Sequence, residues 1–109
     1  MLESLFGSIN KERVLFYIYA REEGYAREIA RFFNTDLLGI QRQLENLESG
    51  GVFYSRLAGR TRLYAFNPRY AFLPELKTLL EKALSFMPAE EKNRLMLVRK
   101  RPRRKGKPL

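Results

Sequence analysis

The stretch "YAREIARFFNTDLLGIQRQLENLESGG", residues 25–51, predicts two helices joined by a tight turn. Apolar residues share one face of the first helix, over residues 25–34, and a turn with capping residues follows it. Thr35 or Asp36 opens the second helix, and the pair Gly50-Gly51 ends it. The buried stripe of the second helix repeats at spacings of three, four and three residues, and consists of Leu37, Ile40, Leu44 and Leu47.

The segments on either side of this pair predict further helices and a hairpin. Upstream, Ser8 caps a helix over residues 9–23, which Gly24 stops. Downstream, residues 52–57 and 61–67 are rich in aromatic and β-branched side chains and predict two strands, joined by a glycine-containing loop at 58–60. Pro74 suits the first position of a helix over residues 75–86, and Pro88 begins a short last helix with a basic end.

This order of elements predicts an α+β, mainly α fold, namely a winged helix-turn-helix with a three-helix core and a two-stranded wing. In that arrangement the second helix of the pair enters the DNA major groove, and the hairpin lies along the adjacent backbone. We expect residues 1–88 to form this domain with its dimerisation helices, and residues 89–109 to form a short basic helix and a basic tail. Gly39 costs its helix about 1 kcal/mol relative to alanine, which suggests close approach by a neighbour.

The composition narrows the chemistry that the chain can support. Its 109 residues fit one domain, and its longest apolar run, residues 14–20, is far too short to cross a membrane. The absence of Cys and His excludes disulfides, thiolate or imidazole metal sites and the usual nucleophile–base pairs. We therefore expect a cytoplasmic protein that is not an enzyme, with no catalytic residues, no cofactor, no metal and no membrane partner.

The positive charge is unevenly placed along the chain. Residues 1–91 contain 12 Lys or Arg and 12 Asp or Glu, so the net charge of +9 comes from residues 92–109, which contain nine basic and no acidic residues. Segregated positive charge indicates a polyanionic partner, of which nucleic acid is the commonest. A second interval without acids, residues 51–73, contains the four arginines Arg56, Arg60, Arg62 and Arg69.

The helix pair and hairpin resemble the winged helix-turn-helix of ArsR-like bacterial and archaeal transcription regulators, over roughly residues 8–86. The matching motifs are Glu28-Ile29-Ala30, Leu44-x-x-Leu47-x-x-x-Gly51 and Arg56-x-x-Gly59-Arg60-x-x-Tyr64-x-Phe66-Asn67. The resemblance implies sequence-specific binding of double-stranded DNA by a homodimer that regulates transcription, acting as a repressor by occluding a promoter. Metal-sensing members use Cys or His ligands, which this chain lacks, so metal sensing by that route is excluded.

The second helix of the pair carries the residues expected to read bases. Arg42 lies opposite the buried stripe on a helical wheel, and Gln41 and Gln43 flank it. Because Arg can form two hydrogen bonds to guanine and Gln two to adenine, we predict base contacts by Gln41 and Arg42. The alternative is an ordinary solvated face. Leu38 is expected to be exposed, where it contacts either a thymine methyl group or another subunit.

Contacts to the DNA backbone are expected from the helix pair, the hairpin and the tail. Thr35 and Gln43 are the candidates on the helix pair, with packing as the alternative role of Gln43. The hairpin contributes Arg56, Arg60, Thr61 and Arg62. The tail is expected to bind polyanions without sequence preference, RNA as readily as DNA, through Arg99, Lys100, Arg101, Arg103, Arg104, Lys105 and Lys107.

The two ends of the chain carry more apolar side chains than one small core readily hides, which predicts a homodimer. A two-fold dimer would set two reading helices about 34 Å apart, one turn of DNA. An effector or a different protein partner is also compatible with the sequence. The expected interface consists of Leu2, Leu5, Phe6, Leu73, Leu76, Leu80, Phe86 and Met87.

Two other functions are open on the sequence alone. One is a winged-helix module that binds RNA or a ribonucleoprotein, with the tail as the main contact. The other is a protein-interaction module that uses the terminal helices, with the basic surface incidental. All three hypotheses share the fold and differ in the partner, so they are separated by binding measurements.

Overall fold

The computed structural model describes residues 1–97, which form six helices and three strands. In chain order these are α1 (Glu3–Phe6), α2 (Ile9–Arg21), β1 (Glu23–Gly24), α3 (Ala26–Phe33), α4 (Leu37–Ser49), β2 (Phe53–Ala58), β3 (Thr61–Phe66), α5 (Leu73–Ser85) and α6 (Ala89–Leu97). The mixed, mainly helical class expected from the sequence is confirmed. No helix in the described part of the chain is both long and apolar enough to span a membrane. The expected basic tail, residues 99–107, lies outside the described residues.

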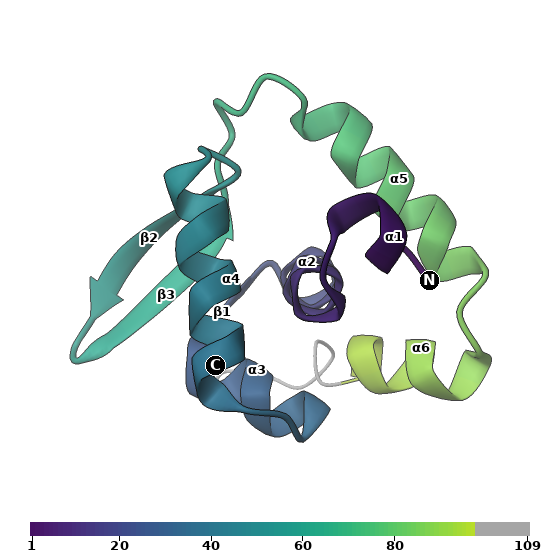
Figure 1. Ribbon diagram of the computed structural model, residues 1–109, viewed down its shortest axis with the longest axis horizontal. Helices are drawn as coiled ribbons and strands as arrows, with labels where there is room; N and C mark the ends of the chain where they lie inside the picture. Colours follow the sequence, from purple (N-terminus) through teal and green to yellow (C-terminus); the bar gives the residue numbers. More distant parts are fainter. Residues whose placement is uncertain (98–109) are drawn as a thin grey trace, which may run out of the picture.

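Helix α2 lies at the centre of the molecule, and the other elements surround it (Figure 1). Its segment from Val14 to Ile18 is at most 2% exposed. A helix that is buried on all sides needs apolar side chains all round, and the run "VLFYI" supplies them. Ser8 caps this helix as predicted, because its Oγ accepts a hydrogen bond from the backbone N–H of Lys11 at 3.1 Å.

The end of α2 differs from the prediction. The helix stops at Arg21, because Glu22 adopts a φ of 76° and Glu23-Gly24 become β1. This strand pairs antiparallel with β3, which is therefore the middle strand in the order β1-β3-β2. Gly24 lies against the ring of Tyr17, and a Cβ built on it would be 2.8 Å from Tyr17 Cε1. Gly24 thus permits a close contact and does not end the helix.

The helix pair at residues 26–49 follows the prediction closely. Asp36 caps α4, since its Oδ2 accepts from the backbone N–H of Gly39 at 3.1 Å. Ile40 and Leu44 are fully buried and Leu47 is nearly so, which confirms the apolar stripe that seats α4 on the core, and Leu37, the first member of the stripe, is only half-buried. The turn between the helices is short because Asn34 adopts a left-handed conformation with φ of 53°.

The hairpin also forms where it was predicted, with one change. Strands β2 and β3 pair from Phe53↔Phe66 to Ala58↔Thr61, so the loop consists of Gly59 and Arg60 only. Ala58, expected in the loop, is the last residue of β2. Gly59 has a φ of 66°, the left-handed conformation that two-residue hairpin loops require.

Helix α6, which begins just after the domain boundary expected at residue 88, packs against α2. Its Leu95 is 1% exposed within the core. The guanidinium of Arg21 donates from Nε to the Leu95 carbonyl at 3.0 Å and from Nη2 to the Arg94 carbonyl at 3.3 Å. Arg94 in turn donates to the Phe32 carbonyl at 2.9 Å. These long-range contacts hold a largely polar helix whose sequence shows little apolar periodicity.

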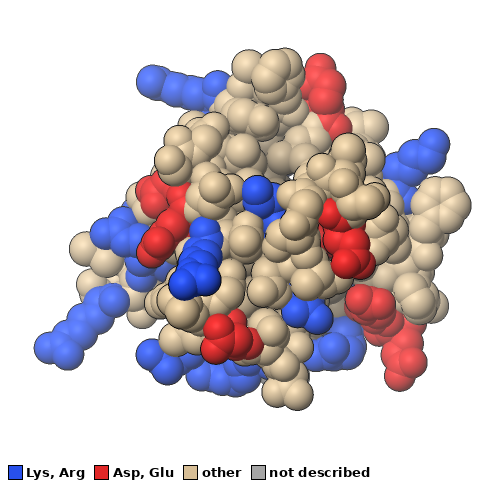
Figure 2. All heavy atoms as spheres, in the orientation of Figure 1, with Lys and Arg blue, Asp and Glu red and all other residues tan. Residues whose placement is uncertain are grey.

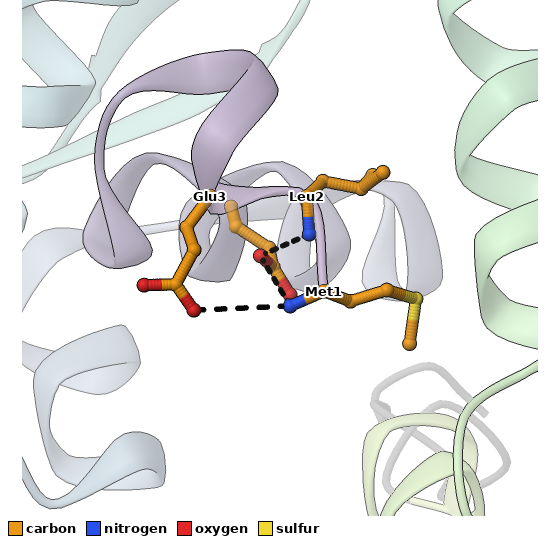
Figure 3. A network of polar contacts seen from close by, with 4 residues as sticks. Met1, Leu2 and Glu3 are labelled. Carbon is orange, nitrogen blue, oxygen red and sulfur yellow. Dashed lines mark hydrogen bonds and ion pairs between the residues drawn. The ribbon is translucent and has the colours of Figure 1, made fainter.

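The short helix α1, which the sequence did not predict, is tied to α2 by one carboxylate. Glu12 of α2 is 8% exposed, and its Oε1 accepts from the backbone N–H of Leu2 at 2.8 Å. The amino group of Met1 donates to the same oxygen at 3.3 Å, and it also lies 3.9 Å from Glu3 (Figure 3). A buried carboxylate needs such partners, so this network fixes where α1 lies beside α2.

Candidate nucleic-acid interface

Helix α4 presents one polar face to solvent. Gln41, Arg42 and Glu45 are exposed on this face, and Leu38 in the first turn is 51% exposed. Gln43, nearer the buried stripe, is half-buried. The sequence placed Gln41, Arg42 and Leu38 outside the core, and the structure agrees. Thr35 is half-buried in the turn before the helix, where its backbone N–H donates to the Ala30 carbonyl at 3.0 Å.

Gly39 allows α4 to lie close to α2, as its position in the helix suggested. A Cβ built on Gly39 would be 2.7 Å from Nδ2 of Asn10. Asn10 is held there because its Oδ1 accepts a hydrogen bond from Arg13 Nη1 at 3.0 Å. The first turn of α4 is therefore seated against α2 while Leu38 faces outward.

A hollow of about 350 Å³ separates α4 from the hairpin. Its lining comes from α3, α4, the hairpin tip and β3, and it includes the largely buried Tyr64. Three arginines and one carboxylate meet at this hollow, together with one amide. The polar and charged residues that line it include Arg27, Gln41, Glu45, Arg60 and Arg62.

The side chains around Tyr64 make the hollow electrostatically mixed. Burial raises the pKa of the Tyr64 hydroxyl, and the carboxylates of Glu48 and Glu45 raise it further. Tyr64 therefore stays neutral in a lining that is rich in arginine. Figure 2 shows Lys and Arg along the left and lower edges of the molecule, on the side of the hairpin and α3, with acidic side chains among them.

The three hairpin arginines that were expected to act together do not share one face of the hairpin. Arg62 lies opposite Leu57 and Arg56 opposite Leu63, so the two arginines point to opposite faces of the sheet. Arg62 Nη1 donates to Ser55 Oγ at 2.9 Å, and Ser55 donates to Glu48 Oε2 at 2.6 Å. This chain of hydrogen bonds joins β3 through β2 to the last turn of α4.

The other two hairpin arginines have contrasting surroundings. Arg56 pairs with Glu23 of β1, with Nη2 and Oε1 2.9 Å apart, on the face that does not line the hollow. Arg60 occupies the hairpin tip and lines the hollow, and its guanidinium forms no ion pair or hydrogen bond with residues 1–97. Thr61, beside it, is half-buried and lines the same hollow. The structure thus brings Arg60, Thr61 and Arg62 to α4, and it leaves Arg56 outside.

Two charged residues that line the hollow were not predicted from the sequence. Arg27 lies in the first turn of α3, and Glu45 lies one turn after Gln41 on α4. Glu45 falls on the exposed side of the helical wheel, so its position was available from the spacing. Arg27 had no such signal, because its place depends on how the hairpin folds back beside α3.

The expected dimer residues fall into three groups in the structure. Leu5 and Phe86 are strongly exposed, at 65% and 72%. Leu2, Phe6 and Leu76 are half-buried against the core, and Leu73 is also half-buried. Leu80 and Met87 are 0% and 8% exposed inside the protomer's own core, so they are removed from the expected interface. Phe72, which was not in that set, is 64% exposed at the start of α5.

Comparison with known proteins adds no family to this description. No protein-family model matches the chain, and no curated protein shows significant sequence similarity to it.

Proposed function

We propose that the protein binds double-stranded DNA in a sequence-specific manner and regulates transcription as a homodimeric winged helix-turn-helix protein of the ArsR-like type. In this proposal α3 and α4 form the helix-turn-helix, and the β2–β3 hairpin is the wing. The observation that carries it is the shared hollow: the exposed polar face of α4 and the arginines of the hairpin border one surface. A groove-reading helix beside a phosphate-binding hairpin needs that juxtaposition.

Each side chain has a role that its chemistry supports. Gln41 and Arg42, exposed on α4, are matched to the hydrogen-bonding edges of adenine and guanine. Arg60, Thr61 and Arg62 contact the DNA backbone, and Arg27 at the start of α3 adds a further cation beside them. Thr35 and Gln43, both half-buried, are secondary backbone contacts, and Leu38 meets either a thymine methyl group or a second subunit.

The lack of an acidic partner supports Arg60 as a phosphate ligand. Its guanidinium is solvated and unpaired within the described residues, so no internal ion pair must be broken when it binds a phosphate. Arg56 already has Glu23 as a partner, so we assign it a smaller share of DNA affinity. The basic tail contributes salt-sensitive affinity that is independent of sequence.

The direct test selects bound sites from random duplex DNA and then titrates the selected site, random duplex DNA and duplex RNA at several salt concentrations. We expect one enriched motif, arranged as two half-sites. Arg42→Ala should then cost roughly 1–3 kcal/mol on the selected site and relax preference at one position. Lys92→Ala, an exposed basic residue on α6, is the matched control and should leave binding to the selected site unchanged.

The other outcomes identify the competing functions. Equal weakening of selected and random DNA by Arg42→Ala would make Arg42 a phosphate contact only. Absence of any enriched motif, with tighter binding to RNA, would favour the RNA-binding module. Removing residues 99–109 should flatten the dependence of affinity on salt by about 0.9 in log–log slope for each phosphate that the tail neutralises, while the motif is retained. A retained slope together with the disappearance of the motif would contradict the role assigned to the tail.

A further inference from the structure

Glu45 is an acidic residue in the middle of the face that α4 turns to solvent. It lies four residues after Gln41 and three after Arg42, so all three side chains emerge on the same side of the helix. It also lines the hollow that Arg60 and Arg62 border. If α4 enters a DNA groove, Glu45 approaches the DNA together with Gln41.

Within residues 1–97 the carboxylate of Glu45 forms no ion pair, although several arginines lie near it. Arg42 is one turn away and exposed, Arg62 donates to Ser55, and Arg56 is paired with Glu23. A structural role would be expected to involve at least one such partner. A carboxylate at this point also repels DNA phosphates, so it weakens nonspecific binding and calls for an interaction that compensates.

The groove offers only a few partners to a carboxylate. A carboxylate accepts hydrogen bonds and donates none, so guanine O6 and N7 and thymine O4 are excluded. The donors in the major groove are the N4 amino group of cytosine and the N6 amino group of adenine. Adenine places the acceptor N7 beside its amino group, which suits the amide of Gln41 and repels a second carboxylate oxygen. Cytosine is the base that remains.

We propose that Glu45 is a specificity-determining residue, whose carboxylate accepts a hydrogen bond from the N4 amino group of a cytosine in the major groove. The inference rests on the proposed DNA-binding function. It assigns Glu45 two effects: it selects cytosine at one position of the site, and it lowers affinity for DNA that lacks cytosine there.

The test compares wild type, Glu45→Gln and Glu45→Ala by selection from random duplex DNA, followed by competition between single-base variants of the selected site. Wild type should require cytosine at one position, and replacing that base pair should weaken binding roughly 5- to 150-fold. Glu45→Ala should lose this discrimination, and Glu45→Gln, whose amide both accepts and donates, should relax it to admit adenine, while both keep the rest of the motif. They should also bind random DNA more tightly than wild type at low salt. Glu90→Gln, an exposed acid on α6, should change neither property.

Two results are distinguishable failures. If wild type enriches a motif and both Glu45 variants enrich the same motif, with equal gains on every sequence, Glu45 only repels phosphates and the inference is overturned. If wild type enriches no motif, the proposed function itself fails, and the assignment of Glu45 fails with it. A circular dichroism melt on each variant confirms that the exposed substitution leaves the fold intact.

Discussion

Arg56 and Arg60 are four residues apart on one hairpin, yet their surroundings predict different contributions to DNA affinity. Arg60→Ala should weaken selected and random DNA alike and reduce the log–log salt slope by about 0.9, because it removes one of the proposed phosphate ligands. Arg56→Ala should leave affinity nearly unchanged, since its guanidinium pairs with Glu23 on the opposite face of the sheet. The exposed pair itself stabilises the fold by about 0.2–1 kcal/mol at most. Titration of both variants at three or more salt concentrations measures these effects.

Two outcomes for these variants would contradict the roles assigned to Arg56 and Arg60. A loss of affinity by Arg60→Ala that is confined to the selected site would mean that the hairpin tip reads bases or groove shape. Equal losses of affinity by Arg56→Ala and Arg60→Ala would mean that the ion pair with Glu23 opens on binding, and that the two faces of the hairpin are used together.

Tyr17 should make the protein sensitive to alkaline pH. The residue is fully buried, and burial together with the carboxylate of Glu28 raises the pKa of its hydroxyl well above the usual value of 10. Above pH 10 the Tyr17 hydroxyl ionises in the unfolded chain but stays neutral in the folded one. The free energy of unfolding is therefore independent of this hydroxyl below pH 10 and falls as the pH rises above 10. The loss is about 1.4 kcal/mol per pH unit above 10. Tyr64, whose pKa is also raised, adds to it.

Urea denaturation at pH 8, 10 and 11 measures this effect. Tyr17→Phe should be less stable at pH 8, because it loses the 2.7 Å hydrogen bond from Arg21, and should lose less stability than wild type between pH 10 and 11. Tyr54→Phe, at a 44% exposed position, is the control and should follow wild type. An identical alkaline loss of stability in wild type and Tyr17→Phe would remove Tyr17 as the cause.

At the scale of elements, caps and periodicity predicted α2 to α5 and the hairpin, and short segments escaped prediction. Strand β1 has two residues and α1 has four, too few for any period to be read. Both depend on long-range partners, β1 on the free edge of β3 and α1 on the carboxylate of Glu12. Their stability comes from contacts that the local sequence does not encode.

The candidate site was also predicted only in part, because the register of the hairpin differs by one residue from the one expected. The predicted three-residue loop would place Arg56 opposite Arg62, on one face of the hairpin. The observed two-residue loop places Arg56 opposite Leu63 instead, which sends the two arginines to opposite faces. Because side chains alternate along a strand, a shift of one residue changes which arginines reach α4. The exposed face of α4 was predictable because its buried stripe fixes the helix rotation.

Two glycines predict opposite responses to alanine. Gly24→Ala should destabilise the fold by roughly 1–3 kcal/mol, because the new methyl group meets the fully buried ring of Tyr17 at 2.8 Å. Gly39→Ala meets the end of the Asn10 side chain at 2.7 Å, which can turn away only by giving up its hydrogen bond from Arg13, and it gains about 1 kcal/mol of helix propensity. We expect Gly39→Ala to be neutral or stabilising. Thermal melts of both variants compare them, and the reverse order would show that the α2–α4 packing is the more rigid of the two.

At the scale of the whole molecule, several large apolar side chains on α1 and at the ends of α5 are exposed without a partner in the described fold. Leu5, Phe72 and Phe86 are each more than 60% exposed, with Leu5 in α1 and the two phenylalanines at the two ends of α5. An interface with a second copy of the chain would remove these apolar side chains from water, which favours dimerisation. This placement, away from the hollow, would leave α4 and the hairpin of each copy free for DNA. Leu57, 61% exposed, belongs to β2, which lies across the molecule from α5 (Figure 1).

Analytical ultracentrifugation of the full chain should therefore give twice the 12.9-kDa chain mass. Phe86→Ser removes one such side chain from each copy and should raise the dimer dissociation constant by roughly 100-fold or more, since each buried side chain stabilises the interface by about 1.5–3 kcal/mol. Leu57→Ser removes an equally exposed side chain from the hairpin and should leave the dimer intact. Dissociation by Leu57→Ser with no effect of Phe86→Ser would place the dimer interface at the hairpin, where it would compete with DNA. A monomeric wild type would leave the α1–α5 surface to a different protein and would require each half-site to be bound independently.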